Sequence, residues 1–511
     1  MIRAALIVAG LGAPARAEDV AITTSAEPTT APVDLRLTLS SFWFREAGAD
    51  AAPLVASGAT VPSASPVTRF FGDMRVELTD GVFQLDARVR QTTSGRFQSG
   101  AAGGGEYDIR TLKLRAGSET TSLYVGRQYV DAVGATKIDG VVVDTRLSPG
   151  WTATLFGGAF PQLGSRSVAT DYPEIEQPGG MLGSALIPIA GGAGSSYAHD
   201  KVNGSFGVGA VRVVQEVQDA SERSRVFVTA NGYARPFSGL DVYHFALIDV
   251  AGAGVGLTNG SLGINARPTD NLELAGSFHH VSSDLLEIAA RNTLSDPDPT
   301  ALGIVQNDTA VVRVSQDQAR AGASLALAQS RFQLSASAGL RRRPRVDVQL
   351  ADGSGMFSFP SVESADVTLS VLDRRSVADL RLSATAIFIY PIGDDVPNRS
   401  AGSTARVVAG RAFADSKLEI EVDGAAQRYQ DVHADGACTS SLDPSSCFGR
   451  ATVSAAQLGA LASWQLGREW LVIVDAHAGV RQMTAASIMG KVDYPTVYSL
   501  TTFARVQWRY R

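Results

Sequence analysis

Hydrophobic and polar residues alternate through the stretch 70–90, which reads FFGDMRVELTDGVFQLDARVR. Asp80-Gly81 in its middle is typical of a two-residue type I′ turn, which needs positive φ at both positions. A hairpin folded there predicts one apolar face, with the pairs Leu78–Phe83, Val76–Leu85 and Met74–Ala87. It also predicts one charged face, with the pairs Arg75–Asp86, Asp73–Arg88 and Glu77–Gln84. Either the apolar face covers a soluble core, or it meets lipid and the charged face lines a barrel.

The same period of two recurs along the chain, beginning with Val33 to Ser40, where Val and Leu alternate with Asp, Arg, Thr and Ser. Further strands are expected at 110–115, 121–130, 138–147, 151–160, 204–216, 222–235, 240–250, 256–267, 272–282, 318–328, 332–342, 363–372, 376–390, 402–413, 417–430, 450–464, 469–482 and 495–511. Short turns and long connections alternate except across 161–203, where one further strand at 182–190 would restore the alternation. The pattern predicts an all-β fold, a large antiparallel transmembrane β-barrel of about 22 strands, with 20 to 24 as the range.

The expected strands are about ten residues long, as the tilted strands of outer-membrane barrels are. In the last one an even-numbered face opposes a face that carries Arg505 and Arg509; the even-numbered residues are Leu500, Thr502, Ala504, Val506, Trp508 and Tyr510. Over residues 33–511 the chain resembles the Gram-negative outer-membrane β-barrel (porin-like) superfamily. Members commonly end on such a strand with a terminal aromatic residue, which the barrel-assembly machinery recognises, although here Arg511 follows Tyr510. The resemblance implies a barrel in the lipid of the bacterial outer membrane, with short periplasmic turns and long extracellular loops.

Residues 1–17, MIRAALIVAGLGAPARA, resemble a secretory signal peptide. Arg3 supplies the positive start, Ala4 to Leu11 the apolar stretch, and Ala15-Arg16-Ala17 the cleavage pattern; Pro14 disfavours the alternative, a buried N-terminal helix. Residues 18–32 then form a short lead, and residues 33–511 form one barrel domain.

Composition agrees with an exported barrel. The 511 residues are 45% hydrophobic and 19% charged, with a net charge of −6, and there is no basic stripe with interleaved aromatic residues, so a nucleic-acid partner is not expected. Cys438 and Cys447 both lie in the polar stretch DGACTSSLDPSSC. In an oxidising compartment two such cysteines most simply form a local disulfide, whereas a metal site would need more ligands than the nearby His433 supplies.

The first functional hypothesis is a passive channel for small solutes, because side chains alone do not fill so wide a barrel. Charged rings set ion selectivity in wide pores. The alternative for each charged residue is a purely structural ion pair between neighbouring strands. The candidate lumen-lining residues are Arg75, Glu77, Asp86, Arg88, Arg90, Asp379, Arg381, Glu419, Glu421, Arg505 and Arg509.

Three other classes of function are weighed against the channel. An energy-coupled transporter carries an N-terminal plug domain, for which residues 18–32 leave no room. An enzyme is not expected, nor a cofactor or metal site, because the six histidines are scattered and no G-x-S-x-G or H-E-x-x-H motif occurs. A structural or ligand-presenting barrel, acting through loops such as 161–203 and 283–316 without open-pore transport, stays the alternative.

Overall fold

A computed structural model describes most of the chain from residue 33 to residue 510. The described residues are 33–48, 67–93, 106–118, 120–161, 168, 171–172, 174–176, 182–185, 187–213, 224–252, 255–282, 315–327, 331–349, 356–359, 361–377, 379–392, 400–431, 449–487, 490–493 and 496–510. The signal peptide and lead at 1–32, the cysteines Cys438 and Cys447, and Arg511 lie outside the described residues.

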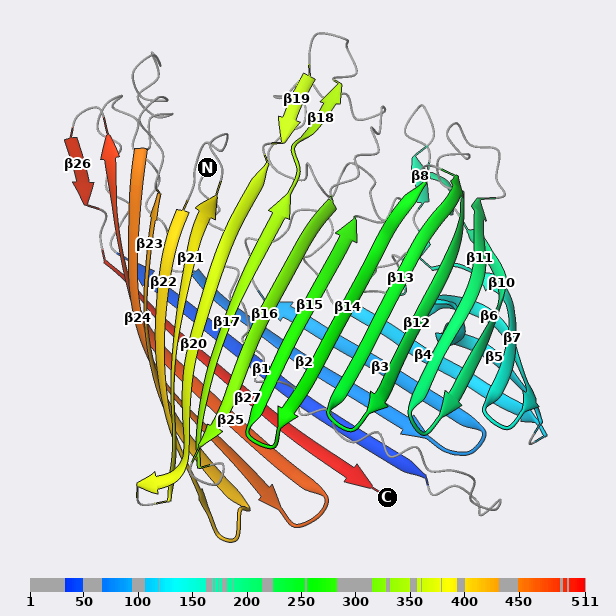
Figure 1. Ribbon diagram of the computed structural model, residues 1–511, viewed down its shortest axis with the longest axis horizontal. Helices are drawn as coiled ribbons and strands as arrows, with labels where there is room; N and C mark the ends of the chain where they lie inside the picture. Colours follow the sequence, from blue (N-terminus) through cyan, green and yellow to red (C-terminus); the bar gives the residue numbers. More distant parts are fainter. Residues whose placement is uncertain are drawn as a thin grey trace.

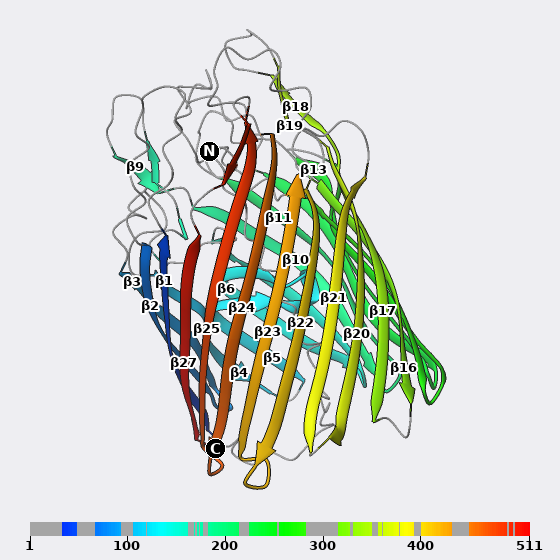
Figure 2. The ribbon, with the colours of Figure 1, turned by 90° about the vertical axis from the view of Figure 1, so that its left-hand side faces the viewer.

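Within the described residues, 22 long antiparallel strands form one closed barrel (Figures 1 and 2). They are β1 (Asp34–Gly48), β2 (Val67–Thr79), β3 (Phe83–Thr93), β4 (Glu106–Gly117), β5 (Thr121–Val130), β6 (Thr136–Ser148), β7 (Trp151–Ala159), β10 (Pro188–His199), β11 (Val202–Val213), β12 (Arg225–Phe237), β13 (Leu240–Gly252), β14 (Gly256–Thr269), β15 (Leu272–Ser282), β16 (Ser315–Leu327), β17 (Phe332–Arg343), β20 (Val362–Val377), β21 (Leu380–Ile392), β22 (Ser400–Phe413), β23 (Leu418–Asp431), β24 (Gly449–Leu466), β25 (Trp470–Ser487) and β27 (Val497–Tyr510). The barrel closes because β1 pairs with β27, Leu35 lying opposite Tyr510. The predicted fold class and strand number are confirmed.

Connections alternate between the two ends of the barrel (Figure 1). The end at the bottom of Figure 1 carries short turns such as 149–150 and 414–417, and the other end carries long connections such as 49–66 and 283–314. Two small hairpins belong to the long connections: β8 (Glu174–Glu176) with β9 (Leu182–Ala185), and β18 (Val346–Gln349) with β19 (Met356–Phe359). The short β26 (Gly490–Asp493) pairs with β25. In the described part of the chain, no helix is long and apolar enough to span a membrane.

The strand expected within 161–203 exists, but its predicted position at 182–190 is wrong. Residues 182–185 belong to β9, and the barrel strand is β10, at 188–199. This strand reads PIAGGAGSSYAH. Its run of Gly and Ala lacks the alternation of large apolar and polar residues that identifies the other strands.

A short 3₁₀ segment, η1 (Asp131–Val133), connects β5 to β6 and packs against β10, β11 and β12. These strands lie beyond β7 along the wall, so a connection this short reaches them only across the concave side of the curved sheet. The segment therefore lies inside the barrel (Figure 1). Around it is the hydrophobic core, formed by Val130, Ala132, Val133, Ile138, Val142, Phe156, Phe160, Ala190, Val211 and Phe227.

Glycines on β10 and β11 explain why η1 fits there. A Cβ at Gly194 would stand 2.9 Å from Cγ2 of Val133, and one at Gly207 would stand 2.7 Å from the same atom. Real Cβ atoms do not approach so closely, so the absence of side chains here admits the segment. The chain leaves η1 through Gly134 and Ala135, at φ 63° and 57°.

The opening hairpin, β2–β3, keeps its predicted faces but not its predicted register. Leu78 lies opposite Leu85 and Val76 opposite Ala87, so each partner has moved by two residues. Neither Asp80 nor Gly81 has positive φ, so the predicted type I′ turn is wrong. Instead Oδ1 of Asp80 accepts hydrogen bonds from the backbone N–H of Val82 (2.7 Å) and of Phe83 (2.5 Å). Because side chains alternate with period two, a shift of two residues leaves each on its predicted face.

Candidate functional site

The charged residues predicted on β2 and β3 form one network. The guanidinium of Arg75 donates two hydrogen bonds to Asp86, at 2.9 and 2.8 Å, and lies 3.1 Å from Glu77. Arg88 and Arg90 both pair with Asp73 on β2. Arg90 lies directly opposite Asp73, whereas Arg75 lies across from Arg88, so Arg75 and Arg88 reach their carboxylates along the diagonal. Diagonal neighbours on adjacent strands are within reach of long side chains.

The network extends across the seam where the barrel closes. Arg36 of β1 lies 3.5 Å from Glu77. Arg509 of β27 donates from Nε to Asp34 at 3.0 Å. Arg505 lies 3.4 Å from the hydroxyl of Ser40, with its guanidinium 5.2 Å from the centre of the Phe503 ring. The contacts of Arg509 with Asp34 and of Arg505 with Ser40 join the last strand to the first.

A second network lies on β21 and β23. Arg381 lies 2.8 Å from Glu419 and also pairs with Glu421. Asp379 takes no part in it. β20 ends at Val377 and β21 begins at Leu380, so Asp379 lies in the intervening turn, exposed and at φ 57°. Its predicted place on a strand is therefore wrong.

Sequence reasoning missed further charged residues of the same kind. Arg320 of β16 pairs with Asp366 of β20, and Arg406 of β22 donates from Nε to Asp423 of β23 at 3.1 Å. On β25, Nε2 of His477 lies 2.8 Å from Asp475, and its Nδ1 lies 3.6 Å from Asp423. Each of these residues alternates with apolar ones along its strand, and this alternation is the signal in the sequence that identifies them.

The ion pairs lie on the same face of the strands as η1, which is the inner face of the barrel. On β12 the core residue Phe227 shares its strand face with Thr229, Asn231 and Tyr233, because the register is continuous between them. The Tyr233 hydroxyl donates to Asp241, which also accepts from Nε of Arg235 at 2.7 Å. A hydrophobic inner face near η1 thus continues into a charged inner face toward the turn end of the same strands.

Part of the β7–β10 connection is held by a buried ionic cluster. Arg127 of β5 donates from Nε to Asp139 of β6 at 2.6 Å and also pairs with Asp171, whose side chain is 1% exposed. The Tyr172 hydroxyl donates to Asp139 at 2.6 Å. Burial and this hydrogen bond raise the pKa of Tyr172 well above its ordinary value. The cluster fixes residues 171–172 to β5 and β6, near the end of the barrel that carries the long connections.

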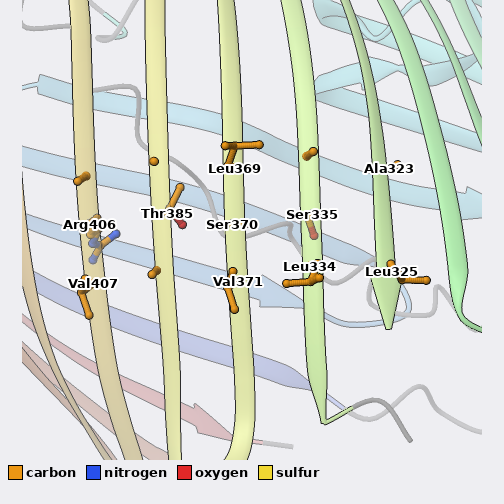
Figure 3. Close-up of a pocket in the computed structure, with 14 residues that line it drawn as sticks. Ala323, Leu325, Leu334, Ser335, Leu369, Ser370, Val371, Thr385, Arg406 and Val407 are labelled. Atoms are coloured by element: carbon orange, nitrogen blue, oxygen red, sulfur yellow. The ribbon is translucent and has the colours of Figure 1, made fainter. Parts of the chain in front are cut away.

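An apolar groove of about 600 Å³ lies elsewhere, across β16, β17 and β20 to β22 (Figure 3). Alanines and exposed leucines and valines line it, among them Leu325, Leu334, Leu369 and Val371. Arg320 and Asp366 belong to the other face of these strands, because they alternate with the exposed residues. The groove is therefore mainly a depression in the apolar outward face. Residues of the opposite strand face also border it: Ser335, Ser370, Thr385 and Arg406.

In the residues that the structure describes, no three His, Cys, Asp or Glu side chains are arranged to hold a metal ion. Neither a family model nor a curated protein matches the chain. Solved structures with a similar fold include Pseudomonas aeruginosa OccD3 (11% identity, TM-score 0.36, covering 95% of this chain and 94% of that one). They also include Acinetobacter baumannii OccAB4 (9%, 0.36, 95% and 100%) and the copper transporter OprC (11%, 0.41, 95% and 82%).

The architecture itself, rather than these distant similarities, decides the class of the protein. An even number of antiparallel strands closes into a barrel with short turns at one end and long connections at the other. Exposed large apolar side chains such as Leu114, Leu155 and Leu458 cover the face opposite the ion pairs. These are the features of barrels that span the bacterial outer membrane, where closure pairs every backbone group. The chain is an outer-membrane β-barrel protein.

Proposed function

We propose that this barrel is a passive channel for small solutes and that its ion-paired inner face is the wall of the pore. The observation that carries the proposal is the solvent exposure of these side chains. Arg381 is 47% exposed and Arg406 is 42% exposed, although both point away from lipid. Water therefore reaches the inner face of β21 and β22, as a conducting lumen requires.

The wall proposed for the pore comprises the strand residues predicted from the sequence and further residues that form ion pairs on the same face in the structure. They are Arg75, Glu77, Asp86, Arg88, Arg90, Arg381, Glu419, Glu421, Arg505 and Arg509, with Arg320, Asp366, Arg406, Asp423 and His477 added. Rings of charged side chains set ion selectivity in wide pores. Because both signs occur and most charges are paired, we expect weak ion selectivity and permeation governed mainly by solute size.

The proposal extends to export and assembly. Residues 1–17 would serve as the signal peptide, and the last strand, with Trp508 and Tyr510, would engage the barrel-assembly machinery. A disulfide between Cys438 and Cys447 would then form in the oxidising compartment outside the inner membrane. Mass spectrometry of the protein from an outer-membrane fraction tests the cleavage after Ala17 and the disulfide together.

Planar-bilayer recording of the refolded protein tests the channel. We expect ohmic conductance steps, and swelling of liposomes that hold the protein when a small sugar is added outside. Detergent without protein is the control. A correctly folded barrel that is silent in both assays would overturn the proposal. The β18–β19 hairpin, which extends beyond the rim in Figure 1, would then favour a barrel that presents its loops to a ligand.

A further inference from the structure

Among the described residues, Arg320, Arg381 and His477 each reach a carboxylate two strands away, directly across a glycine of the strand between them. Arg381 also reaches Glu419, which lies opposite Ala412 of that strand. On the inner face Gly339 of β17 lies directly opposite Arg320 on one side and Asp366 on the other. Two similar rows follow around the wall: Arg381–Gly410–Glu421 and Asp423–Gly459–His477. The repetition indicates one structural device used three times.

The glycines are needed because the paired side chains lie over them. A Cβ at Gly459 would stand 2.0 Å from Nδ1 of His477 and 2.5 Å from Oδ1 of Asp423. One at Gly339 would stand 2.5 Å from Oδ1 of Asp366, and one at Gly410 would stand 3.1 Å from Cγ of Glu421. All three glycines are buried, although they face the interior of a wide barrel. What covers them is the charged pair itself.

Strand spacing explains the arrangement. Neighbouring strands are about 4.8 Å apart, so partners two strands apart are separated by about 10 Å at the backbone. Two side chains bridge that distance only by lying flat along the wall toward each other, and any side chain between them blocks the path. On β2 and β3 the partners Arg75 and Asp86 are on adjacent strands, and no glycine lies between them.

We propose that Gly339, Gly410 and Gly459 determine the calibre and charge selectivity of the pore, by letting basic side chains and carboxylates lie together flat against the wall. This inference rests on the proposed channel function. The atoms that a new Cβ would meet are mostly side-chain atoms, which can turn away while the backbone of the barrel stays in place. Substitution therefore moves charged groups into the lumen and separates them from their partners.

The test is single-channel recording of Gly459→Ala, Gly339→Ala and Gly410→Ala in the full-length protein. We expect lower conductance and a shifted reversal potential in a salt gradient, in the order Gly459, Gly339, Gly410 set by the distances above. The matched control is Gly424→Ala on β23, where the nearest side-chain atom, Cδ1 of Leu458, is 3.9 Å away. The control should behave as wild type. Conducting wild-type and Gly459→Ala channels with the same conductance and selectivity would overturn the inference and leave the channel function standing.

A second measurement does not depend on conduction. Gly459→Ala should lower the unfolding midpoint of the detergent-solubilised protein when His477 is present, and should lower it less in a His477→Ala background, where only Oδ1 of Asp423 remains close to the new Cβ. Equal effects in the two backgrounds would mean that Gly459 does not accommodate His477, and would overturn the inference even if the wild type conducts. A silent wild type would overturn the proposed function instead, and with it the role in selectivity.

Discussion

Glycines on the inner wall have different roles in two regions of the barrel. In the corner formed by β5, β6 and β10 to β12, Gly194 and Gly207 make room for η1, and Val133 of η1 is completely buried. In the arc from β20 to β25, Gly410 and Gly459 make room for polar side chains, of which Arg381 keeps the most contact with water. The same small residue therefore closes one side of the barrel and keeps the other open, depending on whether its neighbours are apolar or charged.

The energetics of the two regions differ accordingly. Burial of an apolar side chain the size of Val133 stabilises the fold by about 1.5–3 kcal/mol, and the corner holds a contiguous set of such residues. A half-exposed ion pair such as Arg381–Glu419 contributes only about 0–1 kcal/mol after solvent screening. We expect the corner to hold the barrel's shape and the arc to tune what passes through it.

The largest effect is expected from a charge in the corner. Val133→Asp buries a carboxylate without a partner and should lower the free energy of unfolding by about 3–5 kcal/mol. Urea unfolding in detergent, followed by tryptophan fluorescence, measures it. The control is Val82→Asp in an exposed turn, where Val82 is 60% exposed and little change is expected. Similar losses of unfolding free energy in the two variants would mean that water reaches Val133 as easily as it reaches the exposed turn.

A smaller effect is expected at the exit from η1. Gly134 has φ 63°, and a Cβ there would stand 2.7 Å from Cγ2 of the buried Thr229. Gly134→Ala should therefore cost about 1–3 kcal/mol, from backbone strain and contact together. The matched variant is Ala135→Gly at φ 57°, which should be neutral or stabilise by up to about 1 kcal/mol. A loss from both variants would contradict the close packing of η1 on β12.

The same contrast explains what could be predicted from the sequence. Alternation revealed most strands of the charged arc, because an apolar residue faces lipid where its neighbour faces water. It failed on β10, whose inner positions Ala190 and Gly194 are small so that η1 and the core can pack on them. The small residues that let η1 pack on β10 therefore also remove the alternation by which the strand could be recognised in the sequence.

The sequence predicts on which strand face the charged residues lie, but not which of them form ion pairs with each other. A register shift of two residues left Arg75 and Asp86 on their predicted face and still within reach of each other. The rows through Gly339, Gly410 and Gly459 depend on the register of three strands at once, which no single-strand pattern contains. At Asp379 the residues before Leu380 include no proline or glycine, so the sequence carries no signal that the strand is interrupted there.

In the arc, effects on selectivity should exceed effects on stability. Arg381→Gln leaves Glu419 and Glu421 without their common partner and should raise the preference for cations, whereas Glu421→Gln should lower it. Each should change the free energy of unfolding by less than about 1 kcal/mol, because the pairs are partly exposed. Reversal potentials in a salt gradient measure the first effect and urea unfolding the second. Shifts of the same sign in the two variants would contradict a wall whose charges face the permeating ions.

The smallest effect is expected outside both regions, at the turn that ends β2. Hydrogen bonds from the backbone N–H of Phe83 and Val82 hold the pKa of Asp80 below its ordinary value. A folded-state pKa that is lowered contributes stability that is present above the unfolded value, near pH 4, and is lost as pH falls through the folded value. The stability advantage of wild type over Asp80→Ala should therefore shrink in acid. Asp80→Asn keeps an uncharged acceptor, so its stability advantage over Asp80→Ala should not change with pH. Unfolding midpoints from pH 7 to pH 3 measure this difference, and an advantage over Asp80→Ala that stays constant with pH would mean that the carboxylate charge adds nothing to the turn.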